Sequence, residues 1–193
     1  MKFPKYIFFT GAPGSAWSVT AKTLETIPLF NTSDRSVTRQ YRSPNGANHN
    51  GIYYGESMEL QAKLDADYLD TAWQTTDGTR LIKSHEWAFQ LDDIETKFPG
   101  QWIMLVVRPD DACSKSWFDS GGFSITYPNY QSYADVDTMN RSIADINTCI
   151  TAFADKHQVK FEKFDSSWIE RNFLACVSVP QLPIDLRVAL IRL

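Results

Sequence analysis

The chain has 193 residues, 43% of them hydrophobic and 22% charged, a balance that excludes a disordered, collagen-like or low-complexity protein. Its 19 basic and 23 acidic side chains give a net charge of −4, which argues against a globally basic nucleic-acid-binding protein. The length suits one domain, residues 1–193, with a sizeable core.

Cysteine usage and the length of the apolar runs bear on the compartment. Cys113, Cys149 and Cys176 are odd in number and widely spaced, which favours free thiols in a reducing environment. No stretch has the pattern of a secretory signal peptide or the length of a membrane span. We therefore expect a cytoplasmic protein with neither a membrane nor a nucleic-acid partner.

Hydrophobic periodicity predicts strands that alternate with helices. Strands are expected at 6–9, 81–82 and 103–107, with a further strand nearer an edge at 159–161. Apolar residues at helical spacing predict helices at about 15–27, 56–73, 87–98 and 139–153. This alternation indicates an α/β fold, a three-layer sandwich with a central parallel sheet. A polar, glycine-containing stretch predicts a long loop at about 31–55, and such loops are commonly functional.

A turn of small residues follows the first predicted strand, with the sequence Gly11-Ala12-Pro13-Gly14-Ser15-Ala16-Trp17-Ser18. A strand, a tight turn and a helix N-terminus together make an anion site, because backbone N–H groups converge there. The turn departs from the Walker pattern, since Ala16 replaces the second glycine and Trp17 replaces the lysine. This disfavours an ordinary ATPase or GTPase. A plain strand-to-helix turn capped by a serine is the alternative interpretation.

Lys83 and His85 come directly after the predicted strand at 81–82. Residues two apart on an extended backbone point the same way, so the two side chains are expected on one face, at the sheet edge where α/β proteins bind ligands. A lysine can neutralise a transferring anionic group, and a neutral histidine can take a proton from an attacking hydroxyl. The alternative is a solvated lysine and a capping histidine.

Arg108 ends the most apolar predicted strand, and Pro109 with two acids suits the first turn of a helix after it. Ser116 lies about two helical turns further on, so its hydroxyl can return to the side of Arg108. A guanidinium and a hydroxyl on one side form a plausible phosphate clamp. A structural ion pair is the alternative role for Arg108.

Several of these segments occur in the order found in the sulfotransferases that use 3′-phosphoadenosine 5′-phosphosulfate (PAPS), a family that the chain resembles over about residues 5–175. The glycine turn is similar to the family's first strand-to-helix turn, and Lys83-Ser84-His85 to its Lys-[Ser/Thr]-His segment. Residues 98–108, with the sequence FPGQWIMLVVR, resemble the Phe-Pro-Gly lead into its central strand, and residues 159–165 resemble its late strand.

The resemblance implies a P-loop and sulfotransferase-like fold, and transfer of a sulfuryl group from PAPS to a hydroxyl or amine of a small-molecule or carbohydrate acceptor, with no metal ion. It implies that the residues from Gly11 to Ser18 bind the phosphosulfate, and that Arg108 and Ser116 bind the 3′-phosphate. It further implies that Lys83 stabilises the sulfuryl group and that His85 is the catalytic base.

The chain departs from the family pattern at two places. Gly14 stands where the family has Lys or Arg, and the chain has no counterpart of the family's C-terminal Arg-Lys-Gly segment. Gly14 favours an alternative function, a non-catalytic nucleotide- or phosphate-binding module of the same fold, whereas the Lys83 and His85 pair argues against it. A P-loop kinase is a further alternative, which Trp17 and Arg108 disfavour.

Overall fold

The structure is a computed structural model that describes residues 2–36, 41–42, 48–49, 51–55, 59–124 and 134–193. The strands are β1 (Tyr6–Gly11), β2 (Tyr41–Arg42), β3 (Asn48–His49), β4 (Arg80–Lys83), β5 (Trp102–Val107), β6 (Glu162–Lys163) and β7 (Arg187–Arg192). The α-helices are α1 (Trp17–Leu24), α2 (Ala66–Asp70), α3 (Leu91–Lys97), α4 (Asp110–Asp119), α5 (Val136–Lys156) and α6 (Ser166–Phe173). Short 3₁₀ helices are η1 (Ser33–Arg35), η3 (Glu86–Phe89) and η4 (Gly122–Ser124).

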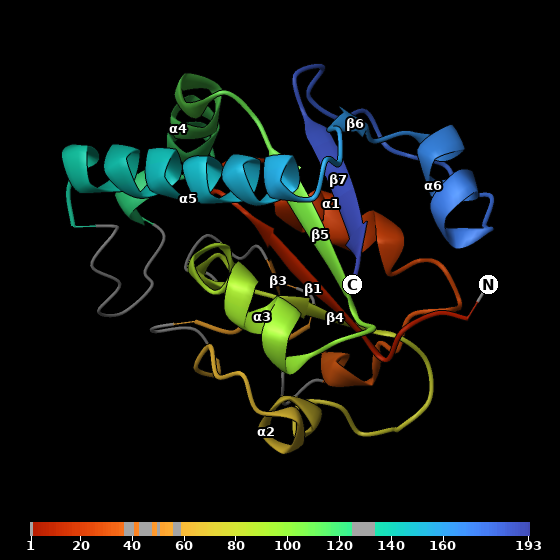
Figure 1. The fold of residues 1–193 in the computed structure, drawn as a ribbon. Helices are drawn as coiled ribbons and strands as arrows, with labels where there is room; N and C mark the ends of the chain where they lie inside the picture. Colours follow the sequence, from red (N-terminus) through yellow and green to blue (C-terminus); the bar gives the residue numbers. More distant parts are fainter. Residues whose placement is uncertain (1, 37–40, 43–47, 50, 56–58, 125–133) are drawn as a thin grey trace.

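Five strands form one sheet in the order β4-β1-β5-β7-β6 (Figure 1). β1 pairs in parallel with β4 on one side and with β5 on the other. The expected parallel sheet is therefore confirmed for these three strands. β7 differs, because it runs antiparallel to β5 and to β6. Its first residue, Arg187, pairs with Val107, the last residue of β5, because the chain returns to the carboxyl end of β5 before β7 begins.

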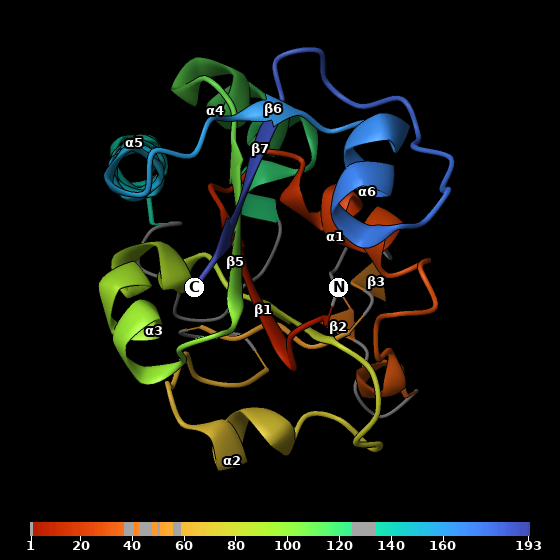
Figure 2. The same cartoon turned by 45° about the vertical axis from the view of Figure 1, so that its right-hand side comes forward.

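Helices cover both faces of this sheet (Figure 2). Alternate residues of β1 and β5 divide between two apolar clusters, as period-two strands require. Phe8 and Leu105 pack with residues of α3 and α5, whereas Phe9 and Met104 pack with residues of α1 and α6. The fold is therefore α/β with a mixed, helix-flanked sheet whose parallel part carries the glycine turn.

The predicted helix at 139–153 is confirmed as α5, which buries its apolar stripe and begins with a capping box of Asp135 and Thr138. Other predicted elements differ. The helix expected at 56–73 is reduced in the described residues to α2, because residues 59–64 are not helical and Leu60 bridges to Tyr54; residues 56–58 lie outside the described residues. The helix expected at 87–98 is divided into η3 and α3.

The strand expected at 159–161 begins later, as β6, and does lie at the sheet edge, whereas β7 was not predicted. The long loop expected at 31–55 contains η1 and the two-stranded β2–β3 pair; its residues 37–40, 43–47 and 50 lie outside the described residues. Within the described ranges, no helix has both the length and the apolar character that a membrane span requires.

Candidate functional site

The glycine turn joins β1 to α1 at the carboxyl end of the parallel strands. Two of its residues adopt left-handed backbone conformations, Gly14 with φ 76° and Ala16 with φ 65°. Ala16 is the N-cap of α1 and makes no side-chain capping bond, so the serine cap of the alternative interpretation is absent at this helix. The turn is closed by a bond from the Ser15 N–H to the Ala12 carbonyl at 3.1 Å.

Gly14 packs directly on the backbone of α4. A Cβ at this position would lie 2.0 Å from the carbonyl oxygen of Cys113 and 3.0 Å from the backbone nitrogen of Trp117. Any side chain would therefore clash with main-chain atoms, and the positive φ adds strain for every residue except glycine. Helix α4 therefore occupies the space in which a side chain at position 14 would start.

Ser15 places a buried hydroxyl inside the turn. Its Oγ has no hydrogen-bond partner among the described residues, although the side chain is fully buried. An unsatisfied buried hydroxyl is destabilising by about 1–3 kcal/mol and is uncommon in folded proteins. Such a group is suited to a ligand or a water molecule that completes its bonding. Ala12 and Pro13 are buried beside it, and Ser18 is half-buried on α1.

Trp17 is part of the core and not a surface residue of the turn. Its indole lies parallel to the ring of Phe9, with centroids 5.8 Å apart, and 4.0 Å from the imidazole of His85. The side chain that replaces the Walker lysine therefore packs beneath the turn. Its contribution to the site is the packing of the indole against Phe9 and His85. Its backbone N–H lies in the first turn of α1.

His85 lies immediately beyond β4 and is buried against the turn. Its Nδ1 is hydrogen-bonded to the Gly11 carbonyl, and its own carbonyl accepts a bond from the Thr10 hydroxyl at 3.2 Å. A carbonyl oxygen only accepts, so Nδ1 must carry the hydrogen of this bond. The neutral imidazole is therefore held in the tautomer in which Nε2 is the basic nitrogen.

Lys83 ends β4 and is enclosed by the protein. Its ammonium lies 2.7 Å from Oε1 of Glu25, just after α1, and 5.0 Å from the centre of the Tyr53 ring. Burial by itself would lower the pKa of Lys83, but the nearby charges of Glu25 and Asp34 outweigh it and raise this pKa. Lys83 is thus a charged, fully buried lysine whose charge is already neutralised by Glu25.

Arg108 follows β5 and joins the turn to a distant segment. Its Nε and Nη2 donate to the two carboxylate oxygens of Asp185 at 2.8 and 3.2 Å, and its Nη1 donates to the Gly14 carbonyl at 3.0 Å. The bonds from Arg108 hold the pKa of the Asp185 carboxyl below its usual value. Arg108 therefore forms a structural ion pair, the alternative role considered for it, with Asp185. The same guanidinium also donates to the backbone of the turn.

Ser116 is half-buried on α4, the helix that packs on Gly14. Its carbonyl accepts bonds from the N–H and the hydroxyl of Ser120 at 3.1 and 2.8 Å. Among the described residues, no hydrogen bond joins the Ser116 hydroxyl to Arg108 or to the turn. The expected clamp of arginine and serine is thus present only as two residues on neighbouring segments.

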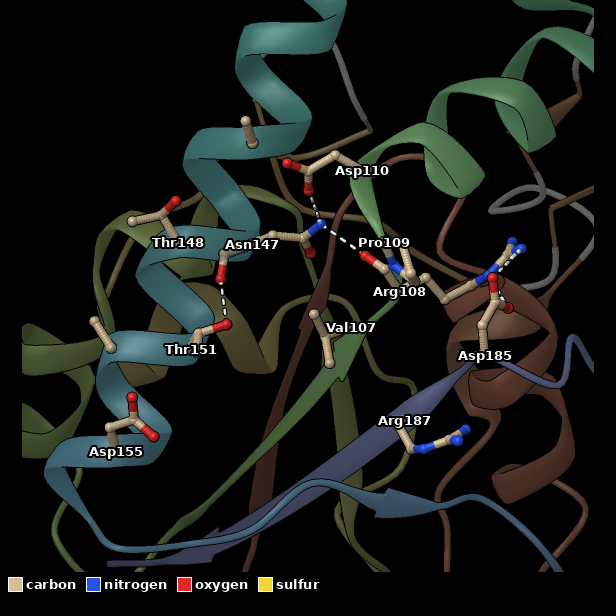
Figure 3. A pocket seen from close by; sticks show the side chains of 12 residues that line it. Val107, Arg108, Pro109, Asp110, Asn147, Thr148, Thr151, Asp155, Asp185 and Arg187 are labelled. Carbon is tan, nitrogen blue, oxygen red and sulfur yellow. Dashed lines mark hydrogen bonds and ion pairs between the residues drawn. The ribbon is translucent and has the colours of Figure 1, made fainter.

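A cavity of about 830 Å³ opens beside Arg108, between α5 and the facing ends of β5 and β7 (Figure 3). Asn147 of α5 lines it and is only 7% exposed. Its amide nitrogen donates to the Arg108 carbonyl at 2.9 Å and to the Asp110 carboxylate at 2.6 Å. This amide fixes the backbone from which the Arg108 side chain departs. Arg187 and Asp155 stand on opposite walls of the cavity.

Three of these residues were not among the sequence candidates. Asn147 carried a local signal, because it is a polar residue next to the apolar stripe of α5. Glu25 and Asp185 carried none, since they lie 58 and 77 residues from Lys83 and Arg108 along the chain. Elsewhere, no three His, Cys, Asp or Glu side chains of the described residues gather in a way that could hold a metal ion.

The site thus consists of the glycine turn with His85 and Arg108 bonded to its backbone, Lys83 buried behind it, and Ser116 on the helix beside it. In comparisons with known proteins, the chain matches no family model, no curated protein and no solved structure.

Proposed function

We propose that the protein transfers a sulfuryl group from PAPS to a hydroxyl or amine of a small-molecule or carbohydrate acceptor in the cytoplasm. One observation carries the proposal: His85 and Arg108, from two different strand ends, both bond to the backbone of the same turn, at Gly11 and Gly14. The β1–turn–α1 unit between parallel neighbours supports a P-loop and sulfotransferase-like fold.

The residues of the turn suit an anionic donor. The first N–H groups of α1 and its dipole favour a phosphate or sulfate, and the buried Ser15 hydroxyl is available as a further donor. Arg108 has five N–H groups, of which three make the bonds described above, so it retains donors for a phosphate. When bound, PAPS supplies the sulfuryl group and a nucleotide leaving group.

His85 is suited to the role of general base. Its Nδ1–H bond to the Gly11 carbonyl orients the ring and stabilises the positive charge that appears when Nε2 takes a proton from the acceptor. A direct role for Lys83 on the transferring group requires its ion pair with Glu25 to open. In the closed arrangement, stabilisation of the transferring group therefore falls to the N–H groups of the turn.

Calorimetric titration with 3′-phosphoadenosine 5′-phosphate (PAP), the spent donor, tests the proposal. We expect micromolar binding without metal, and a loss of about tenfold or more in Arg108→Ala, because a charge-assisted bond to phosphate is removed. Titration with ATP and Mg²⁺ is the control. Binding of ATP alone would support a kinase instead, and binding of neither ligand would end the sulfotransferase proposal.

A second candidate function is a phosphate- or nucleotide-binding module without catalysis. The packing of Gly14 on Cys113 favours it, because no lysine can enter the turn to stabilise the leaving group. The two functions differ in the behaviour of His85→Gln with PAPS and a panel of hydroxyl acceptors. A sulfotransferase loses about a hundredfold or more of its turnover without the base, whereas a binding module shows no turnover in either form.

A further inference from the structure

A buried ionic cluster lies behind the carboxyl end of β4. The carboxylate of Glu25 accepts from Lys83 at 2.7 Å through one oxygen and pairs with Arg35 through the other. Asp34, also buried, accepts a bond from the backbone N–H of Ile52 at 2.8 Å. Two cations and two anions therefore balance one another in a cluster that is buried except for the partly exposed Arg35, and an uncompensated charge among its buried members would be strongly destabilising.

Gly51 ties the chain beyond η1 to this cluster. A Cβ there would lie 2.5 Å from the Asp34 carboxylate and 2.6 Å from the Lys83 ammonium, so the backbone of Gly51 packs directly between them. The following residues then run along β4, because the N–H of Tyr54 donates to the Lys83 carbonyl at 2.8 Å. The cluster thus fixes residues 51–54 against β4, the strand that precedes the candidate base.

A continuous series of contacts leads from the cluster to the imidazole. The Lys83 ammonium lies 5.0 Å from the centre of the Tyr53 ring, and that ring meets Trp17 edge-on with centroids 5.4 Å apart. Trp17 in turn lies 4.0 Å from His85, and Nδ1 of this histidine is hydrogen-bonded to the Gly11 carbonyl. The imidazole is therefore packed between the turn and the Trp17 ring, which contacts the Tyr53 ring next to Lys83.

We propose that Lys83 and Glu25 are positioning residues. Their buried ion pair holds the Tyr53 ring against Trp17, and Trp17 fixes the His85 ring beside the glycine turn. The lysine then acts through other residues and not by touching the ligand. The catalytic consequence rests on the proposed function, whereas the positioning itself is a property of the protein without ligand and is tested there.

The experiment compares Lys83→Met, Glu25→Gln and the double variant with the wild-type chain. Lys83→Met leaves Glu25 with only the partly exposed Arg35, and Glu25→Gln removes the carboxylate that pairs with Lys83, so we expect the His85 ring to lose its fixed position in both. The double variant removes both charges of the ion pair, so neither is left without the other. The readouts are the NMR resonances of the His85 imidazole and of the Trp17 indole N–H.

We expect both resonances to shift or broaden in the two single variants and to return toward their wild-type positions in the double variant. Arg80→Met is the matched control, because Arg80 is also buried and paired with an acid, Asp70, at the opposite end of β4. It should lower the unfolding temperature without moving the His85 and Trp17 resonances. Glu25→Gln keeps the side-chain shape and serves where Lys83→Met does not fold.

Two results would overturn the proposal: wild-type resonances in folded single variants, or a double variant no closer to wild type than Lys83→Met. Failure of the sulfotransferase function is a separate outcome. It appears as absence of PAP binding in the calorimetric titration, while the resonances still follow the expected pattern of loss and rescue.

Discussion

The two strands that flank β1 lead into basic residues, since β4 ends in Lys83 and β5 is followed by Arg108, and each basic residue is paired with an acid from a distant part of the chain. At the end of β4, the side chains of Lys83 and Glu25 are 1% and 4% exposed. At the end of β5, those of Arg108 and Asp185 are 10% and 32% exposed. The two pairs have the same charges and similar separations but very different contact with water.

This difference decides what each cation can do. An ion pair that is partly open to water can exchange its acid for an incoming anion, because water screens the released carboxylate. A fully buried pair cannot, since releasing Glu25 would leave an uncompensated charge in the interior. Arg108 is therefore suited to ligand binding, and Lys83 to holding the protein together beneath the site.

Replacing each cation should give the largest contrast. Lys83→Met leaves Glu25 with only Arg35, and we expect the free energy of unfolding to fall by about 3–5 kcal/mol, as for other broken buried pairs. Arg108→Met breaks a more exposed pair and should lower it by about 1–2 kcal/mol. Urea unfolding of both variants measures the difference, and equal losses would contradict the distinction between the two strand ends.

The turn between the two strand ends provides the next test. Gly14→Ala places a Cβ 2.0 Å from the Cys113 carbonyl and should lower the free energy of unfolding by about 2–4 kcal/mol through clash and strain. Gly100→Ala is the matched control, since Gly100 has a similar φ of 78° but no atom within 4 Å of its Cβ position. The control should lose only about 1 kcal/mol, from backbone strain. Similar losses in thermal or urea unfolding would mean that α4 does not constrain the turn.

Neutralising each acid compares the two pairs as binding sites. Asp185→Asn removes the competing carboxylate from Arg108, so we expect the affinity for PAP to rise about threefold or more. Glu25→Gln should leave PAP affinity within about twofold, because Lys83 remains enclosed behind the turn. Calorimetry measures both constants. A larger gain in Glu25→Gln than in Asp185→Asn would reverse the assignment of the ligand-binding cation.

The smallest expected effect is the difference between wild type and Asp185→Asn in acid, which reports on the exposed pair because other carboxyls with a lowered pKa, such as that of Asp70, titrate in both proteins. The pKa of Asp185 lies below its ordinary value of 3.8 in the folded protein, because Arg108 bonds to the ionised form. Its contribution to stability is therefore complete above about pH 4 and is lost as the pH falls through the folded-state value. Asp185→Asn should show a shallower loss of stability than wild type below pH 4, measured by urea unfolding at several pH values. Parallel curves would show that the pair contributes nothing measurable.

The positions of the candidate residues could be predicted from local sequence, but their partners could not. Apolar runs located β1, β4 and β5, and the polar residues after them had to reach one edge because the strands are parallel. Glu25 and Asp185 reach that edge only through the tertiary fold. The same limit applies in part to Gly14, because the turn gives it a positive φ but the clash that a Cβ would make comes from α4.

The predictions of helices and strands were wrong where pairing with a distant segment outweighed the local hydrophobic periodicity. The expected helix at 56–73 loses its first half in the described residues, where Leu60 bridges to Tyr54 instead of continuing a helical stripe. β7 was missed although its central residues are apolar, because nothing before it in the sequence indicates that the chain returns to the carboxyl end of β5.

The place of β7 in the sheet has a consequence for how the protein is assembled. β7 is synthesised after β6 but lies between β6 and β5, so β6 has no strand to join until β7 has been made. Sheet growth therefore cannot follow the order of translation on this side. Within the sheet, β6 and β7 pair residues only 24 to 26 apart, whereas β1 pairs with β4 and β5 across 74 and 95 residues. Because pairings between distant segments form slowly, we expect the β6–β7 pair to gain protection from hydrogen exchange no later than the β4-β1-β5 half during refolding.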